Sequence, residues 1–232
     1  MSTVGAYLRR WCYTAQRPKK QAVEQQPGRI QRWLAEEYPA IERRAKAEGA
    51  EIHWCDESGL RTDANYARSY APKGQTPVIR QVARRGRTNL VSTVSNRGKL
   101  RFMVYDDSMH ADTFIEFLRR LLKTARNHQD DKKIFLILDN LRVHHAKKVR
   151  QWVENEKRKE KIELFFLPPH AQQYNPDEFL NNDVKQNVNR KRIPRNSEEL
   201  KENLRAYLKR IQRMPEHIRS LFRAPTVRYA AG

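Results

Sequence analysis

The chain has 232 residues, with 47 Lys or Arg against 27 Asp or Glu, so its formal net charge is +20. The length is typical of one domain, and 38% hydrophobic residues are enough to build a core. No apolar run approaches the roughly 18 residues of a membrane span. Residues 1–6 lack the apolar stretch of a signal peptide, and two cysteines, Cys12 and Cys55, leave no room for a disulfide framework. We therefore expect neither a secreted, nor a membrane-embedded, nor a disulfide-stabilised protein.

The positive charge is concentrated at the two ends of the chain. Residues 1–50 carry a net charge of +5 and residues 184–232 carry +9, in clusters such as Arg17/Lys19/Lys20. Clustered basic side chains favour a phosphate polyanion as partner, because each contact releases counterions condensed on the nucleic acid. The alternative is a solvated basic surface. Membrane-surface binding is a weaker alternative, because no basic helix has an apolar face suited to lipid.

The first 50 residues are expected to be helical, in two parts. Apolar residues recur at helical spacing from Val4 to Trp11. The basic segment 17–20, which contains a proline, is typical of a linker. A second helical pattern runs from residue 29 to 48, and Pro39 should kink or split it because proline removes a backbone donor.

From residue 51 onward strands and helices alternate. Residues 52–57 alternate in the manner of a strand, and residues 63–78 carry the prolines and glycines of an irregular excursion. Residues 95–98, Ser-Asn-Arg-Gly, indicate a hairpin, and the apolar run Ile134–Leu138 is typical of a strand buried on both faces. We expect further strands at 89–94, 100–105 and 162–167, and helices at 110–127, 144–158, 175–190, 197–213 and 216–223.

This order predicts an α/β fold. Three meandering strands followed by strand–helix crossovers give a mixed sheet flanked by helices, which is the ribonuclease-H-like arrangement. A short helical N-terminal remnant precedes it. We place one unit at residues 1–50 and the sheet-containing domain, with a helical C-terminal tail, at residues 51–232. A fold of this kind does not by itself define a function.

Three carboxylates occupy positions that carry chemistry on such a frame. Asp56 lies in the first strand, Asp139 ends the buried strand, and Glu178 lies in the first turn of the helix after the last strand. Neighbouring parallel strands should place Asp56 beside Asp139, with Glu178 reaching in from the flank. Converging carboxylates repel one another unless a cation neutralises them. Hard oxygen ligands suit Mg²⁺ or Mn²⁺, and two such ions can act together in phosphodiester displacement.

Each of these residues also has a simpler structural explanation. A strand-terminal Asp such as Asp139 is often a turn residue or a helix cap. Glu57 is the rival of Asp56, pointing to the opposite face of the same strand. Glu178 completes a capping box with Asn175 as N-cap and Pro176 at the first helical position. The ordered triple on suitable elements is a stronger indication than any single member.

The motifs around these residues resemble a known family. They are Trp54-Cys55-Asp56-Glu57-Ser58-Gly59-Leu60, the Tyr70–Pro77 segment, Leu138-Asp139-Asn140 with His144-His145, Leu167–His170, Tyr174–Glu178 with Phe179–Lys185, and the closing Val227–Ala231. Residues 51–232 are similar to the catalytic domain of DDE transposases of the Tc/mariner superfamily, in its bacterial insertion-sequence branch. The 38 residues between Asp139 and Glu178 fall within the loose range of such families.

The resemblance implies an activity, a metal centre and partners. Asp56, Asp139 and Glu178 would be the catalytic and metal-binding triad, holding Mg²⁺ or Mn²⁺, with two ions per active site. The chemistry would be hydrolysis at transposon ends followed by attack of a 3′-hydroxyl on target DNA, usually at TA. The partners would be double-stranded DNA at the transposon ends and the target, and a second copy of the chain as a homodimer on DNA. The location would be the bacterial cytoplasm, on the nucleoid when bound to DNA.

The chain departs from the family at its start. Members usually begin with paired helix-turn-helix modules that read the terminal repeats, whereas here Thr3–Trp11 resembles only the recognition helix of the last one, and Arg17–Ala22 its trailing linker. This pattern fits a truncated frame, one half of a frameshifted product, or a catalytic module working with a separate binding polypeptide. Two other functions stay open, a DNA-binding relic without catalysis and a ribonuclease-H-like nuclease that cuts without joining.

Several further side chains are candidates for DNA contact. They are Arg9, Arg10, Lys19, Lys20, Lys73, His144 and Lys185. Lys73 lies in a Pro-Gly loop that can project from the sheet, and Lys185 follows Glu178 by seven residues on the same helical face. His144 follows Asp139 and is a candidate either for supporting a metal ligand or for touching DNA. For Lys185 the alternative is a solvated lysine.

Overall fold

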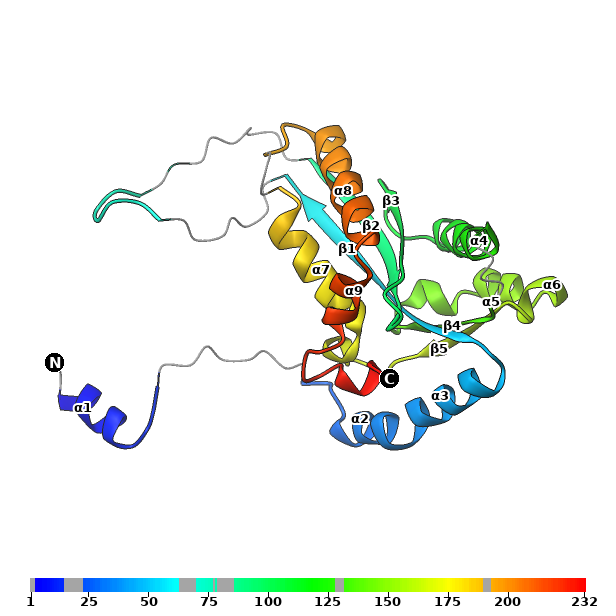
Figure 1. Cartoon of the computed structure of the whole chain (residues 1–232), viewed down its shortest axis with the longest axis horizontal. Helices are drawn as coiled ribbons and strands as arrows, with labels where there is room; N and C mark the ends of the chain where they lie inside the picture. The colour runs from blue at the N-terminus through cyan, green and yellow to red at the C-terminus, as the bar shows by residue number, and fades with distance from the viewer. Residues whose placement is uncertain are drawn as a thin grey trace.

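A five-stranded mixed sheet with strand order β3-β2-β1-β4-β5 organises the fold (Figure 1). The computed structural model describes residues 3–14, 23–62, 70–76, 78, 86–127, 132–189 and 193–232. β1 (Glu51–Arg61), β2 (Arg87–Val94) and β3 (Leu100–Tyr105) form an antiparallel meander, and β4 (Ile134–Leu138) and β5 (Ile162–Phe166) run parallel to β1. This order confirms the expected ribonuclease-H-like arrangement.

The hairpin between β2 and β3 forms where the sequence predicts it. The amide of Ser95 donates to the carbonyl of Lys99, and that of Gly98 donates to the carbonyl of Ser95. Gly98 has φ +85°, a region that side chains with a Cβ rarely adopt. A Cβ there would also lie 2.7 Å from the carbonyl oxygen of Pro215. The turn is therefore tied to the C-terminal helices by a close backbone approach that only glycine permits.

The two faces of the sheet carry different helices, because side chains along each strand alternate between them. α7 (Pro176–Asn187), α8 (Ser197–Gln212) and α9 (Pro215–Leu221) cover the face that holds Trp54 and Ile137 (Figure 1). α4 (Ala111–Asn127), α5 (Lys147–Val153) and α6 (Glu156–Lys159) lie on the other side, where α4 and α5 pack on Cys55 and Leu138.

The helices before β1 pack into the first of these two cores. α2 (Pro27–Arg32) continues through the π-helical segment η1 (Trp33–Glu37) into α3 (Tyr38–Ala47). Pro39 lies in the first turn of α3, directly after the π-helical segment, where its missing N–H removes one donor from the helical run. The helical pattern is therefore continuous in backbone angles, with a π-helical segment just before Pro39 in place of the expected split. Trp33 and Tyr38 are buried, and Tyr38 contacts Trp54 with a ring separation of 6.0 Å. Residues 27–47 therefore share a core with the sheet domain that we placed after residue 50.

The helix predicted at residues 144–158 is interrupted, so this prediction is wrong about its continuity. Residues 144–158 form the end of a 3₁₀ turn, η2 (Arg142–His145), and then α5 and α6. Ala146 and Asn155 adopt extended backbone angles, and the Asn155 side chain accepts a hydrogen bond from the amide of Lys157. Such local bonds compete with helix continuation. The remaining ordered turns are η3 (Gln172–Tyr174) and η4 (Arg228–Ala230).

The N-terminal helix α1 (Thr3–Arg10) follows the predicted range. Its apolar side chains are exposed, Val4, Tyr7 and Leu8 among them. In the ranges that the structure describes, no helix is both long enough and apolar enough to cross a membrane.

Candidate active site

Asp56 and Asp139 lie at matching positions on neighbouring strands. The parallel pairing of β1 with β4 aligns Glu51 with Ile134 and Trp54 with Ile137. The same offset, carried two residues further, sets Asp56 beside Asp139, which follows the last residue of β4. Adjacent strands are about 4.8 Å apart. The two aspartates are thus side by side at this end of the sheet, as the sequence predicts.

The helix that carries Glu178 is anchored to β1 by Asn175. The Asn175 side chain accepts from the amide of Asp177 at 3.0 Å, which caps α7, and its Nδ2 donates to the carbonyl of Cys55 at 2.8 Å. Asn175 is 1% exposed. The first turn of α7 is therefore fixed against the strand, one residue before Asp56. Asn175 is thus the N-cap that the sequence predicts. Its bond to the Cys55 carbonyl was not predicted.

Glu178 turns toward Asp56. The Glu178 side chain lies close enough to Asp56 to raise its pKa, and Asn181, one turn further along α7, donates Nδ2 to Asp56 Oδ2 at 2.9 Å. Burial is the largest cause that raises the pKa of Asp56 well above its ordinary value, and the contact with Glu178 and the charge of Asp177 raise it further. The Glu178 carboxylate thus takes part in an acidic pair with Asp56, beyond any role at the helix end.

A third acid lies beneath this pair. Asp177 is fully buried, and Ser92, which pairs with Asp56 across β1 and β2, donates Oγ to Asp177 Oδ2 at 2.7 Å. Burial raises the pKa of Asp177 well above its usual range, with Glu57 and Glu178 adding to this effect and the Ser92 bond opposing it. Two buried oxygens here, Asp177 Oδ1 and Asn181 Oδ1, have no hydrogen-bond partner.

This donor set fits a hard divalent cation. Within the described ranges, no lysine or arginine forms an ion pair with Asp56 or Glu178. Carboxylates brought together without a basic partner favour the uptake of protons or of metal ions. Their oxygen atoms, with the amide of Asn181 beside them, are the ligand type that Mg²⁺ and Mn²⁺ prefer.

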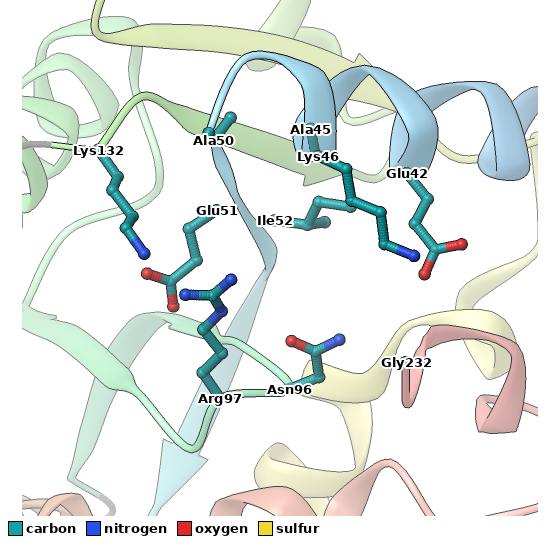
Figure 2. A pocket seen from close by; sticks show the side chains of 11 residues that line it. Glu42, Ala45, Lys46, Ala50, Glu51, Ile52, Asn96, Arg97, Lys132 and Gly232 are labelled. Atoms are coloured by element: carbon teal, nitrogen blue, oxygen red, sulfur yellow. The ribbon is translucent and has the colours of Figure 1, made fainter.

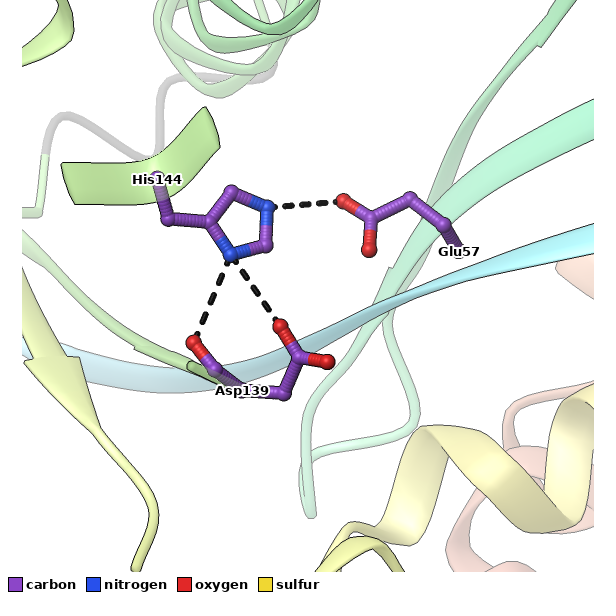
Figure 3. A group of neighbouring side chains, drawn as sticks. All are labelled: Glu57, Asp139 and His144. Carbon is purple, nitrogen blue, oxygen red and sulfur yellow. Dashed lines mark hydrogen bonds and ion pairs between the residues drawn. The ribbon is translucent and has the colours of Figure 1, made fainter. Parts of the chain in front are cut away.

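On the other side of Asp139 lies a buried histidine between two carboxylates. His144 Nε2 is 2.9 Å from Glu57 Oε1, and Nδ1 is 3.2 Å from Asp139 Oδ1 (Figure 3). The ring is almost fully buried and packs on Phe114, with centroids 4.5 Å apart. Burial alone would lower the pKa of His144, but the bonds to Asp139 and then Glu57 outweigh it and raise the pKa to about 9.

Asp139 is correspondingly held in its ionised form. Burial acts to raise its pKa, but the hydrogen bonds from His144 and from the Leu141 amide, together with the nearby positive charge, leave the pKa below its ordinary value. The Leu141 amide donates to the same oxygen, Oδ1, at 2.9 Å. Asp139 is therefore the ionised member of the acidic group, whereas Asp56 retains a proton more readily.

Among the described residues, Glu57, Asp139 and His144 are the group of three whose possible ligand atoms all lie within 4.8 Å of one another, whereas Asp56, Asp139 and Glu178 are not that close together. However, the carboxylates of Glu57 and Asp139 lie at opposite nitrogens of the ring (Figure 3). A histidine binds one metal through one nitrogen and usually uses the other to contact a supporting group. The ring is thus hydrogen-bonded between the two carboxylates and buried, and the DNA contact that we also considered for His144 stays a prediction.

Two pockets lie at opposite ends of the sheet. One, of about 260 Å³, adjoins Asp139, and we call it the Asp139 groove; it is lined by residues 139–141 and 167–172. The side-chain Nε2 of Gln25 donates to the backbone carbonyl of His170, one of the lining residues, at 2.7 Å. The other, of about 380 Å³, lies at the start of β1, where Glu51, Arg97 and Lys132 approach one another (Figure 2). Of these two pockets lined by described residues, the groove is the one that adjoins Asp139.

The other predicted DNA-contacting side chains are not brought together into one described site. Arg9 and Arg10 are exposed on α1, Lys73 is exposed in a turn closed by the bond from Gln75 to Pro72, and Lys185 is exposed on α7. Lys19 and Lys20 lie outside the described residues. The role of these basic residues stays a prediction.

Sequence reasoning missed Asn181, Asp177 and Ser92, and it treated Glu57 only as a rival of Asp56. Asn181 had a usable signal, since it lies three residues after Glu178 and thus on the same helical face. Ser92 had none, because its position opposite Asp56 follows from the register of the hairpin. Glu57 and Asp56 both prove to be part of the acidic group, on opposite faces of one strand.

The sheet order and the position of this group place the chain in the class of ribonuclease-H-like domains. A family model described as DDE superfamily endonuclease matches residues 51–201. The chain therefore belongs to the DDE superfamily endonuclease family.

Solved structures share the fold. The Mos1 mariner paired end complex with Mn is 15% identical, with a TM-score of 0.67 over 98% of this chain and 70% of that chain. The catalytic domain of Mos1 mariner transposase is 14% identical, with a TM-score of 0.54 over 88% of this chain and 96% of that chain. At these identities the similarity establishes the fold alone. A comparison with curated protein sequences found no match.

Proposed function

We propose that the chain is a metal-dependent transposase that cuts DNA at the ends of an insertion sequence and joins them to target DNA. The observation that carries the proposal is the parallel pairing of β1 with β4, which sets the positions of Asp56 and Asp139 side by side, together with the effect of Glu178 from α7 on the pKa of Asp56. Membership of the DDE superfamily endonuclease family supports it. The formal net charge of +20 suits a DNA substrate.

Each residue has a part in this proposal. Asp56 and Asp139 would hold Mg²⁺ or Mn²⁺ from the strands, with two ions per site, and Glu178 would complete the ligand set from α7. Bound ions of this kind activate the attacking oxygen and stabilise the leaving oxygen of a phosphodiester. Asn181 fixes one oxygen of Asp56. The Asp139 groove, which is lined by Asp139, would receive the scissile strand.

The partners follow from the reaction. Joining two transposon ends needs two active sites, so we propose a homodimer assembled on double-stranded DNA. The solved Mos1 structure named first above is a paired end complex, which supports an assembly that holds two ends. We further propose that the protein works in the bacterial cytoplasm, on the nucleoid. Arg9, Arg10, Lys19, Lys20, Lys73 and Lys185 would contact the DNA backbone.

The test uses labelled duplexes made from the DNA that flanks the coding sequence, with Mg²⁺ or Mn²⁺. We expect the purified protein to cut at an element end, and Asp139→Asn and Glu178→Gln to lose at least about 100-fold in rate, since they remove metal ligands. A Lys73→Gln variant should instead weaken binding and leave the cut position unchanged. Equal cleavage by the wild type and Asp139→Asn would overturn the proposal.

A second substrate separates the alternatives. With an end that already carries a free 3′-hydroxyl, a transposase joins the end to a target plasmid. A nuclease cuts without joining. Steeply salt-dependent DNA binding with no nicking in either metal would instead identify a DNA-binding relic.

A further inference from the structure

We infer that His144 is a positioning residue for Asp139: held by Glu57, its ring fixes one oxygen of Asp139 so that the other faces the metal site. This inference rests on the proposed function, because it concerns the same carboxylate.

The two carboxylate oxygens of Asp139 differ in their contacts. His144 Nδ1 and the Leu141 amide both contact Oδ1, at 3.2 and 2.9 Å. The described contacts of this carboxylate thus go to one oxygen, and the other points away from the ring (Figure 3). A carboxylate fixed through one oxygen cannot rotate without breaking both bonds. Its second oxygen is then held in one direction for coordination.

The imidazole ring of His144 is itself fixed on two sides. Glu57 Oε1 contacts Nε2 at 2.9 Å from the opposite edge, and Phe114 packs on the ring with centroids 4.5 Å apart. Glu57 comes from β1, the strand that carries Asp56. The ring therefore links the two strands whose aspartates form the site, and it sets Asp139 relative to Asp56. Partners of this kind behind metal ligands typically change metal affinity by about 10–100-fold when removed.

The next residue, His145, lies in different surroundings from His144. His145 is exposed and stacks on Phe166 with centroids 4.2 Å apart. No hydrogen bond joins it to the acidic group among the described contacts. The two adjacent histidines differ in what they touch, which makes His145 a matched control.

Two isosteric variants test the inference. Asparagine places its amide nitrogen the same number of bonds from Cβ as Nδ1, so His144→Asn keeps the contact with Asp139. Glutamine reaches as far as Nε2, so His144→Gln keeps the contact with Glu57 and loses that with Asp139. Both are to be compared with the wild type, His145→Asn and Asp139→Asn, in the full chain without DNA.

The readout is Mn²⁺ affinity, measured by the loss of the free Mn²⁺ signal in electron paramagnetic resonance, with the unfolding temperature recorded for each variant. We expect His144→Gln to weaken Mn²⁺ binding by at least about 10-fold and His144→Asn and His145→Asn to stay within about 3-fold of the wild type. In end cleavage, the Mn²⁺ concentration giving half-maximal rate should rise in the same order.

The outcomes distinguish this inference from the proposed function. If His144→Gln binds Mn²⁺ as the wild type does while Asp139→Asn does not, the positioning role is wrong and the metal centre stands. The role is likewise wrong if His144→Asn and His144→Gln lose affinity equally, or if His145→Asn loses as much. If the wild type and Asp139→Asn bind Mn²⁺ equally, the proposed metal centre itself fails.

Discussion

Asn175 should stabilise the protein through two separable bonds, and each can be removed in turn. Asn175→Ala deletes the N-cap of α7 and the bond from Nδ2 to the Cys55 carbonyl. Loss of a cap costs about 1 kcal/mol, and a buried carbonyl left without its partner costs about 1–3 kcal/mol. We therefore expect Asn175→Ala to lower the free energy of unfolding by about 3 kcal/mol. For a chain of this size that corresponds to a fall of roughly 6–12 °C in Tm.

Serine separates the two contributions. Its hydroxyl can still cap α7 but cannot reach the Cys55 carbonyl, so Asn175→Ser should recover about 1 kcal/mol relative to Asn175→Ala. The assay is urea unfolding followed by tryptophan fluorescence, since Trp33 and Trp54 are buried. Both variants should also bind Mn²⁺ more weakly, because Glu178 lies in the turn that Asn175 fixes. An Asn175→Ala protein within about 0.5 kcal/mol of the wild type, the usual range of neutral surface changes, would refute this reasoning.

Three further predictions concern the rest of the fold. Burial lowers the pKa of His53 to about 4, although the charge of Glu51 opposes this shift. In the unfolded chain the same histidine takes up a proton near pH 6.5. The free energy of unfolding should therefore fall as the pH drops from about 6.5 to 4. His53→Gln should reduce that slope in urea titrations at pH 5 and 7, and an unchanged slope would contradict the assignment. Gly98→Ala should lower Tm by several degrees, because the Cβ meets Pro215; an unchanged Tm would contradict this. A chain of residues 23–232 should keep the wild-type Tm, whereas residues 51–232 alone should aggregate or unfold, and a well-folded 51–232 protein would show that α2 and α3 are dispensable.

The sequence allowed the sheet and the neighbouring positions of Asp56 and Asp139 to be predicted because both depend on local patterns, whereas the joining of Glu178 to them in one metal site stays a prediction. The apolar run Ile134–Leu138 defined β4 to the residue, and a strand order with parallel crossovers leaves few topologies. Given that order, Asp56 and Asp139 had to become neighbours. The N-cap at Asn175 was likewise visible as an Asn-Pro pair followed by acids.

The contacts around the triple could not be predicted, because they depend on register and on side chains far apart in the chain. Ser92 reaches Asp177 across 85 positions, and His144 reaches Glu57 across 87. The alternation that made Glu57 a rival of Asp56 was correct, but it could not show that the opposite face holds a histidine that joins Glu57 to Asp139. The division at residue 50 stays a prediction, since chain composition changes there whereas the packing of Trp33 and Tyr38 continues across it.

The hydrogen bond from the Gln25 side chain to the His170 carbonyl limits how far the N-terminal helix α1 can lie from the Asp139 groove. It attaches the start of the second helical segment to the rim of the Asp139 groove. Thr14 and Val23 are nine residue steps apart, so they can be separated by at most roughly 30 Å. Along B-DNA that is about nine base pairs. If the Asp139 groove holds the cut bond as proposed, a DNA contact made from Thr14 falls within about one turn of the duplex from that bond, and insertions between Thr14 and Val23 should lengthen the protected stretch of DNA.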